Sequence, residues 1–203
     1  RDMLVALQKR GVGTHLAKQH AHRNSNYHYV LWYGEERTIL IKHEDYPYHW
    51  PHIAPHEVPK WVYFSSIAET AEGYHDELTD WLEKETSVKL AFQPGTFQIK
   101  LGTERLKRLY ARTELLALNR EEAVQVTGGD YHNLHELFDR LHALGPKIVL
   151  ITDGPAGSYV SDGQNRFKMP IYPDPAAPVE RTGCGDAYTS TFVAALIKGY
   201  PIE

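Results

Sequence analysis

In Asn133-Leu-His-Glu-Leu-Phe-Asp-Arg-Leu-His-Ala-Leu-Gly-Pro-Lys-Ile-Val-Leu-Ile151, an amphipathic helix is followed at once by an apolar strand. Apolar residues recur at helical spacing, and Gly145-Pro146 ends the helix. The nearly continuous apolar run 147–151 is typical of a strand buried on both faces, as in a parallel sheet. The stretch therefore predicts a parallel sheet covered by helices.

The same alternation extends to both sides of this stretch. Strands are predicted at 61–64, 88–92 and 114–118, and helices at 74–85, 103–111, 121–126 and 186–198. A hairpin is predicted around Asp162-Gly163, with strands at 158–160 and 166–171. Strand–helix alternation predicts an α/β fold with a doubly wound, mainly parallel sheet flanked by helices.

A separate β excursion is predicted near the start of the chain. Segments 26–33 and 37–43 are rich in aromatic and β-branched residues and are joined by Gly34-Glu-Glu36, which indicates a hairpin. We therefore expect one domain over residues 1–203, with a small β-hairpin at 27–43 inside it. The chain begins within a predicted helix, and we expect it to be incomplete at both ends.

Composition narrows the classes of partner. The net charge is −4, and no block of Lys or Arg is long enough to indicate a surface for nucleic acid or membrane. Cys184 is the only cysteine, so no internal disulfide can form, which agrees with a cytoplasmic location. No apolar run is long enough to span a membrane.

The stretch Arg181-Thr-Gly-Cys-Gly-Asp-Ala-Tyr188, at the start of the last helix, has the most chemical content. Two glycines one residue apart leave backbone N–H groups unobstructed, and a helix N-terminus attracts anions. A carboxylate at Asp186 could accept a proton from a hydroxyl beside such an anion site. The simpler interpretation, an Asp favoured by the helix dipole, remains open on spacing alone.

Four stretches, in order, resemble the ribokinase-like (PfkB-type) family of carbohydrate kinases. Thr182-Gly-Cys-Gly-Asp-Ala-Tyr188 is similar to the family signature, and Phe92-Gln-Pro-Gly95 resembles a strand that usually ends in Asp/Asn-Pro. The N-x-x-E segment of the family is similar to Leu116-Ala-Leu-Asn-Arg-Glu-Glu-Ala123. The family's strand followed by T-x-G-x-x-G is similar to Ile148-Val-Leu-Ile-Thr-Asp-Gly-Pro-Ala-Gly157. The hairpin at 27–43 is similar to the lid that covers the substrate in that family.

The resemblance implies a role for each matching residue. Asp186 would be the catalytic base, and Gly183, Cys184 and Gly185 would form the anion hole. Asn119, Thr152, Gly154 and Gly157 would border the nucleotide, and Glu122 would organise Mg²⁺ through water. Without the resemblance, Asn119 and Glu122 are typical of a helix cap, and 152–157 of a plain turn. Tyr27, Tyr29 and Arg37 of the lid are candidate substrate contacts; packing of the lid and a surface ion pair are the alternatives.

The chain departs from the family pattern in three respects. Glu180-Arg181 replaces the usual Asp-Thr, which puts the monovalent-cation site of some members in doubt and leaves Arg181 as a candidate phosphate contact. Cys184 replaces a common Ala, and we expect a small packing residue there. The family's first strand and its final segment have no counterpart, so we expect the apolar faces of strands 61–64 and 88–92 to be exposed.

The function that the resemblance implies is ATP-dependent transfer of the γ-phosphoryl group to a hydroxyl of a sugar or sugar-like molecule, with Mg²⁺ bound to ATP. One alternative is a nucleoside (adenosine-type) kinase. Another is a catalytically silent module of the same fold that binds a nucleotide or metabolite. The expected partners are ATP and a small substrate, with neither nucleic acid nor membrane, and the lid is a candidate surface for a homodimer.

Overall fold

The computed structural model describes residues 2–33, 36–42, 44–173 and 182–202, without the side chains of 36 and 37. The chain divides into two compact units, Arg1–His52 and Ile53–Glu203. Within the described residues, no helix is long and apolar enough to cross a bilayer.

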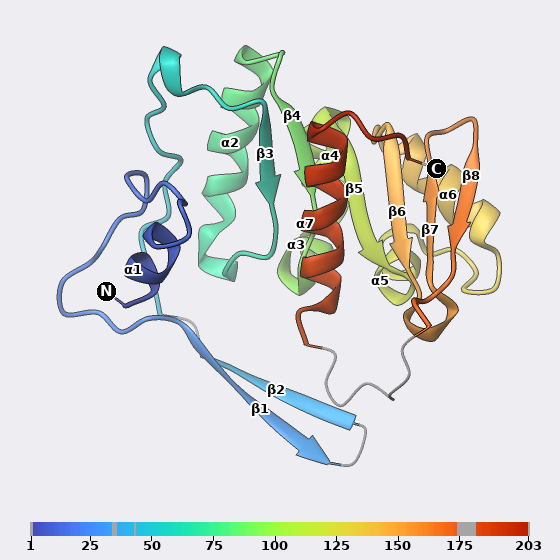
Figure 1. The fold of residues 1–203 in the computed structure, drawn as a ribbon, viewed down its shortest axis with the longest axis horizontal. Coiled ribbons are helices and arrows are strands. Elements are labelled where there is room, and N and C mark those ends of the chain that lie inside the picture. The colour runs from blue at the N-terminus through green and yellow to red at the C-terminus, as the bar shows by residue number, and fades with distance from the viewer. Residues whose placement is uncertain (1, 34–35, 43, 174–181, 203) are drawn as a thin grey trace. The chain divides into compact units, whose positions relative to one another are not determined.

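The first unit contains α1 (Asp2–Gln8) and the hairpin of β1 (Tyr27–Tyr33) and β2 (Glu36–Lys42) (Figure 1). The strands pair antiparallel, with Val30 opposite Ile39, as the aromatic and β-branched pattern predicts. Asn26 closes the base of the hairpin, because its Oδ1 accepts the N–H of Glu44 at 2.7 Å and its Nδ2 donates to Tyr48 at 3.2 Å.

The second unit is built on a six-stranded sheet in the order β3-β4-β5-β6-β7-β8. Strands β3 to β6 are parallel, and β7 and β8 add an antiparallel edge. The strands are β3 (Trp61–Phe64), β4 (Lys89–Phe92), β5 (Thr113–Asn119), β6 (Ile148–Thr152), β7 (Ser158–Ser161) and β8 (Arg166–Met169). The predicted fold class is therefore confirmed: a mainly parallel sheet flanked by helices, with a small antiparallel sheet.

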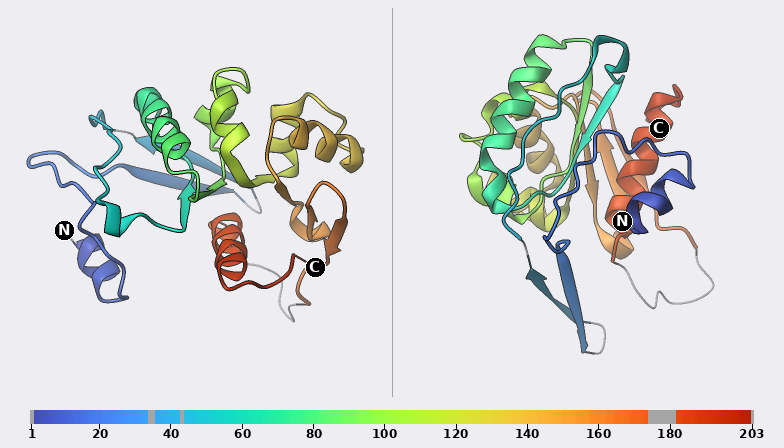
Figure 2. Two further views of the ribbon diagram at one scale, coloured as in Figure 1. Left: turned by 90° about the horizontal axis from the view of Figure 1, so that it is seen from above. Right: turned by 90° about the vertical axis from the view of Figure 1, so that its left-hand side faces the viewer.

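Helices cover both faces of this sheet. They are α2 (Glu72–Lys84), α3 (Thr96–Leu101), α4 (Lys107–Arg112), α5 (Arg120–Thr127), α6 (Leu134–Ala143) and α7 (Cys184–Ile197), with short 3-10 turns η1 (Pro55–Glu57), η2 (Glu69–Ala71) and η3 (Gly154–Ala156). Figure 2 shows α7 on one face and α2, α4, α5 and α6 on the other. Val193 of α7 packs on a core of small and branched residues from the strands: Ala91, Leu115, Ala117, Leu150 and Val160.

The expected exposure of strand 88–92 is wrong. Leu90, Ala91 and Phe92 are all buried, because Ala91 packs on the core beneath α7 and Phe92 lies edge-on to Tyr110 of α4 at 5.5 Å. At the edge of the sheet, β3 is more open, and Tyr63 is 37% exposed. The chain thus covers both faces of β4 with its own elements.

The predicted helix at 103–111 is also corrected. Residues 103–106 form a turn, and the helix that follows, α4, begins only at Lys107. The short helix α3 before this turn is not predicted. Gly102 ends α3 with a φ of +85°, a conformation in which glycine is the favoured residue, so the helical path is broken there. A six-residue helix is too short for periodicity to reveal it.

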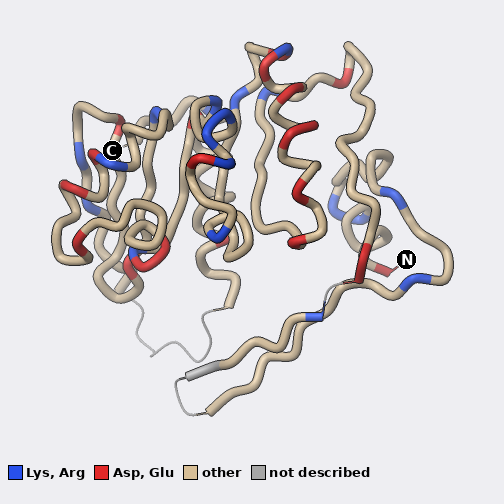
Figure 3. The backbone as a smooth tube through the Cα atoms, turned by 180° about the vertical axis from the view of Figure 1, so that it is seen from behind, with Lys and Arg blue, Asp and Glu red and all other residues tan. Residues whose placement is uncertain are grey.

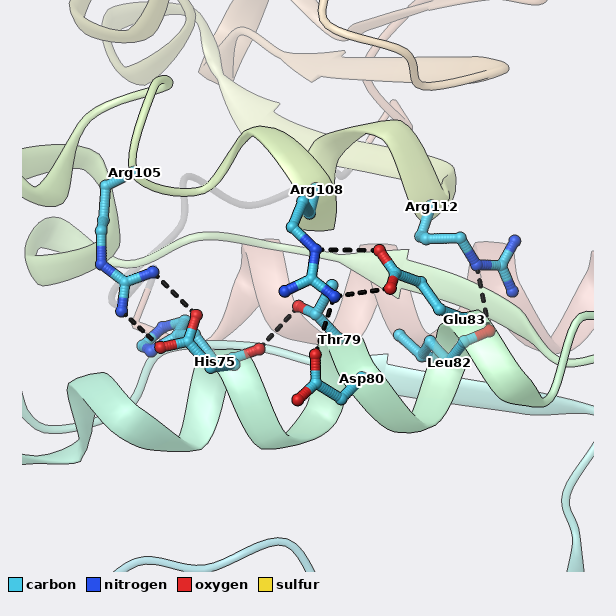
Figure 4. Close-up of polar contacts among 9 residues, drawn as sticks. His75, Thr79, Asp80, Leu82, Glu83, Arg105, Arg108 and Arg112 are labelled. Carbon is cyan, nitrogen blue, oxygen red and sulfur yellow. Dashed lines mark hydrogen bonds and ion pairs between the residues drawn. The ribbon is translucent and has the colours of Figure 1, made fainter.

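Ion pairs join α2 to α4 and to the turn before α4 on the outer surface. Arg105 forms a bidentate pair with Asp76 at 2.8 and 2.7 Å, and Arg108 pairs with Asp80 and Glu83 (Figure 4). Acidic positions follow one another along α2 and basic positions along α4 (Figure 3). These pairs are exposed to solvent, so we expect each to stabilise the fold only weakly, and less in high salt.

Candidate active site at the carboxyl edge of the sheet

The candidate site lies where the parallel strands end. Gln93 follows β4, Asn119 is the last residue of β5, and Thr152 is the last of β6. Asn119 and Thr152 are paired in register, so the turns that follow them start side by side. In open α/β folds, ligands bind at this edge.

The first turn of α7 supplies Asp186 and free backbone N–H groups. Gly183 is the N-cap with a φ of +83°, a left-handed conformation that any other residue would adopt only with strain. The first helical bond is donated by Ala187 to the carbonyl of Gly183, at 2.9 Å. The N–H groups of Cys184, Gly185 and Asp186 therefore precede the helical ladder and have no acceptor within it.

The space beside these amides is open. A Cβ built on Gly183 or Gly185 would meet no atom within 4 Å among the described residues. Cys184, expected to be a small packing residue, is exposed, because it lies on the first turn, before α7 reaches the core. This arrangement fits an anion that approaches the helix N-terminus.

Gln93 joins the end of β4 to Asp186. Its Nε2 donates to Oδ1 of Asp186 at 2.9 Å, and its Oε1 accepts a hydrogen bond from the hydroxyl of Tyr63. Partial burial, with the charge of Asp186 added, raises the pKa of Tyr63 to about 12. Tyr63 therefore keeps its proton near neutral pH, and by donating it to Oε1 sets the orientation of the Gln93 amide.

Asn119 and Glu122 form a capping box at the start of α5. Asn119 Oδ1 accepts the N–H of Glu122 at 2.8 Å, and Glu122 Oε2 accepts the N–H of Asn119 at 2.8 Å. Burial raises the pKa of Glu122, and the negative charge of Asp186 adds to this effect. The predicted cap is therefore present.

The segment 152–157 forms a closed turn around η3. Asp153 donates its N–H to the carbonyl of Gly157 at 2.8 Å, and Gly157 donates to Gly154 at 3.1 Å. Gly157 has a φ of +94°, and a Cβ there would lie 2.1 Å from the carbonyl oxygen of Met169. Glycine is thus required at 157 by both conformation and contact.

Sequence reasoning misses several residues at this edge. It does not single out Tyr63, Arg120 or Asp153, and it includes Gln93 only as part of a stretch that resembles the family. Arg120 and Asp153 directly follow Asn119 and Thr152, and this adjacency to two motif residues is the available signal.

The lid candidates lie in the first unit. Tyr27 and Tyr29 lie two residues apart on β1, so they share one face of the hairpin. Their side chains are 45% and 62% exposed, and their rings contact each other edge to face with centroids 5.3 Å apart. Arg37 pairs through its backbone with Trp32, and its side chain lies outside the described residues. Glu180 and Arg181 lie outside them as well.

The expected Mg²⁺ would need carboxylate ligands at this edge of the sheet. Among the described residues, no group of three or more His, Cys, Asp or Glu side chains could hold a metal ion. Mg²⁺ bound to ATP usually takes one or two protein carboxylates together with phosphates and water. Glu122 is the carboxylate in the matching position.

The comparisons identify the family. The model of the pfkB family carbohydrate kinases matches residues 1–203, so the chain belongs to this family. A cytidine kinase from Thermococcus kodakarensis is 35% identical over 99 residues, which are 48% of this chain and 34% of that protein. The matched region is thus about a third of that relative's length.

Solved structures agree on the fold. A nucleoside kinase from Burkholderia thailandensis, in complex with inosine, has a TM-score of 0.75 at 16% identity and covers 100% of this chain and 65% of its own. Arabidopsis thaliana ribokinase, complexed with ribose and ATP, has a TM-score of 0.64 at 20% identity and covers 87% of this chain and 57% of its own. The fold is therefore ribokinase-like.

Proposed function

We propose that this chain carries the phosphoryl-transfer site of an ATP-dependent kinase that phosphorylates a hydroxyl of a sugar or sugar-like molecule. The observation that carries the proposal is the first turn of α7, where Asp186 directly follows the N–H groups of Gly183, Cys184 and Gly185, which precede the helical ladder. A carboxylate can take the proton of the acceptor hydroxyl while these amides stabilise charge on the transferred phosphoryl group.

Each residue at the edge has a proposed role. Asp186 is the base, and the amides of Gly183, Cys184 and Gly185 form the anion hole. Asn119, Thr152, Gly154 and Gly157 border the nucleotide, and Glu122 acts on Mg²⁺ through water. When bound, Mg²⁺ would neutralise phosphate charge; the chain's own part is to position the phosphates and the carboxylate of Asp186.

A nucleoside as acceptor is the second candidate. Exposed aromatic rings on β1, including Tyr27 and Tyr29, are suited to stacking on a base as well as on a sugar. The similarity to a cytidine kinase supports this candidate. We propose β1 and β2 as a substrate lid, with Arg37 as a further contact.

The hairpin is also proposed as a homodimer surface. Its two faces both carry exposed apolar residues, Tyr29 and Leu40 on one face and Trp32 and Ile41 on the other. A two-stranded ribbon cannot bury both faces alone. The hairpin would therefore contact both the substrate and a second copy.

The test is ADP formation from ATP and Mg²⁺ with ribose, cytidine or inosine as acceptor. Acceptor-dependent ADP formation is expected, and the preferred acceptor separates a sugar kinase from a nucleoside kinase. Binding of ATP without turnover on a wide panel of sugars and nucleosides would instead indicate the silent binding module. Failure to bind ATP at all would refute the proposal.

A further inference from the structure

An ion pair continues the contact between β5 and β6 past the end of the sheet. Backbone pairing between these strands ends at Asn119 and Thr152. The next residue on each side is charged, and Arg120 Nη1 lies 2.6 Å from Asp153 Oδ2. The side chains are only 13% and 11% exposed. The two turns are therefore joined laterally beyond the last pair of strand residues.

Tyr131 completes this contact. Arg120 Nε donates to the carbonyl oxygen of Tyr131 at 2.8 Å, and its guanidinium lies over the Tyr131 ring, 4.6 Å from the centroid. The Tyr131 hydroxyl donates to Asp153 Oδ1 at 3.3 Å. We call these three residues the Arg120 clamp. The guanidinium is held through Nε, Nη1 and its face by contacts within the protein.

Stability alone does not explain such a pair. Taking two charges out of water costs free energy that their attraction often only offsets, and apolar residues of similar size are often equally stabilising. The planar guanidinium, in contrast, imposes direction, because its donors point along set axes. The main physical consequence of the clamp is therefore a defined geometry between two turns.

We propose that the Arg120 clamp is a positioning device for the nucleotide, which holds the turn 119–122 at a set distance from the turn 152–157. This rests on the proposed function, in which both turns border ATP. Arg120 directly follows the N-cap Asn119. Asp153 is the N-cap of η3, and its N–H closes the turn by donating to the carbonyl of Gly157. A shift of either partner would move the groups that face the nucleotide.

The test separates positioning from stability with two variants. Asp153→Asn keeps the shape but removes the charge, and the pair Arg120→Met with Asp153→Leu replaces the ion pair by apolar contact. For each we would measure the thermal midpoint, the dissociation constant for ATP with Mg²⁺ by calorimetry, and amide hydrogen exchange of both turns without nucleotide.

We expect Asp153→Asn to lower the thermal midpoint and to weaken ATP binding on the order of tenfold, as for loss of one hydrogen bond to a charged group. The apolar pair should regain the midpoint, but its ATP affinity should stay low and both turns should exchange faster. KM for the acceptor should change little. Asp139→Asn, in the ion pair of Arg166 at the opposite edge of the sheet, should leave ATP affinity unchanged.

An apolar pair that binds ATP as tightly as the wild type would overturn the inference and make the clamp merely structural. Failure of the proposed function is distinguishable, because there the wild-type protein itself would not bind ATP. In that case the clamp would lose its role toward a nucleotide as well.

Discussion

Gln93 Nε2 lies 2.9 Å from Asp186 Oδ1 and donates a hydrogen bond to it, which joins the end of β4 to the first turn of α7. The two residues are 93 positions apart in the chain. This hydrogen bond fixes the position of the carboxylate that is proposed as the general base.

The proposed base is tested by Asp186→Asn. We expect kcat to fall by about 10²–10⁴-fold, the usual scale for loss of a general base. Affinity for ATP should change little, since the carboxylate is not proposed to hold the nucleotide. Steady-state kinetics and calorimetry on the same preparation check both points, and a variant with most of its turnover would exclude Asp186 as the base.

Gln93→Glu tests the contact described above. The change replaces an amide donor beside Asp186 by a second carboxylate that repels its negative charge, so the acid limb of kcat/KM should move to higher pH. A pH–rate profile measures this shift. Gln164→Glu, an exposed change in the turn between β7 and β8, is the matched control. Identical acid limbs in wild type and Gln93→Glu would contradict the positioning of Asp186 by Gln93.

Glu122 should make the stability of the protein depend on pH. Its pKa in the folded state is raised above the ordinary value of 4.5. Its contribution to stability is therefore fully present below that ordinary pKa and is lost as pH rises through the folded pKa. Glu122→Gln keeps an oxygen for the N–H of Asn119 but cannot ionise, so it should lack this loss.

The measurement is the free energy of unfolding in urea from about pH 4 to 7. The wild type should lose stability relative to Glu122→Gln as pH rises. Glu122→Ala, which removes the capping acceptor, should be less stable than Glu122→Gln by about 0.5–1.5 kcal/mol. A difference between wild type and Glu122→Gln that does not vary with pH would contradict the raised pKa.

Two glycines should differ in their tolerance of Ala. At Gly183 a Cβ meets nothing, so only the left-handed conformation is penalised, by about 1–2 kcal/mol. At Gly157 a Cβ would also collide with Met169, which adds roughly 1–3 kcal/mol. Urea unfolding should therefore rank Gly157→Ala well below Gly183→Ala in stability, and the reverse order would refute the close approach of Gly157 to Met169. Gly183→Ala should mainly weaken phosphate contacts.

Much of the fold follows from local patterns. Helical spacing and apolar runs place α6 and β6 to within one or two residues, and the aromatic segments predict the hairpin of β1 and β2. Alternation implies a parallel sheet, because parallel strands need a crossover that a helix usually supplies. The short α3 is missed, since a helix of that length has no measurable period.

The sequence by itself determined the chemistry-bearing turns: the glycines at 183 and 185 beside Asp186, the capping box of Asn119 and Glu122, and the glycine turn at 154–157. Each depends on residues close in the chain, where backbone conformation and capping are local properties. Only the tertiary structure decided that Tyr63 reaches Gln93, that Gln93 reaches Asp186 and that Arg120 reaches Asp153. These contacts join residues about 30 or more positions apart, and they form because parallel strands bring their carboxyl ends to one edge of the sheet.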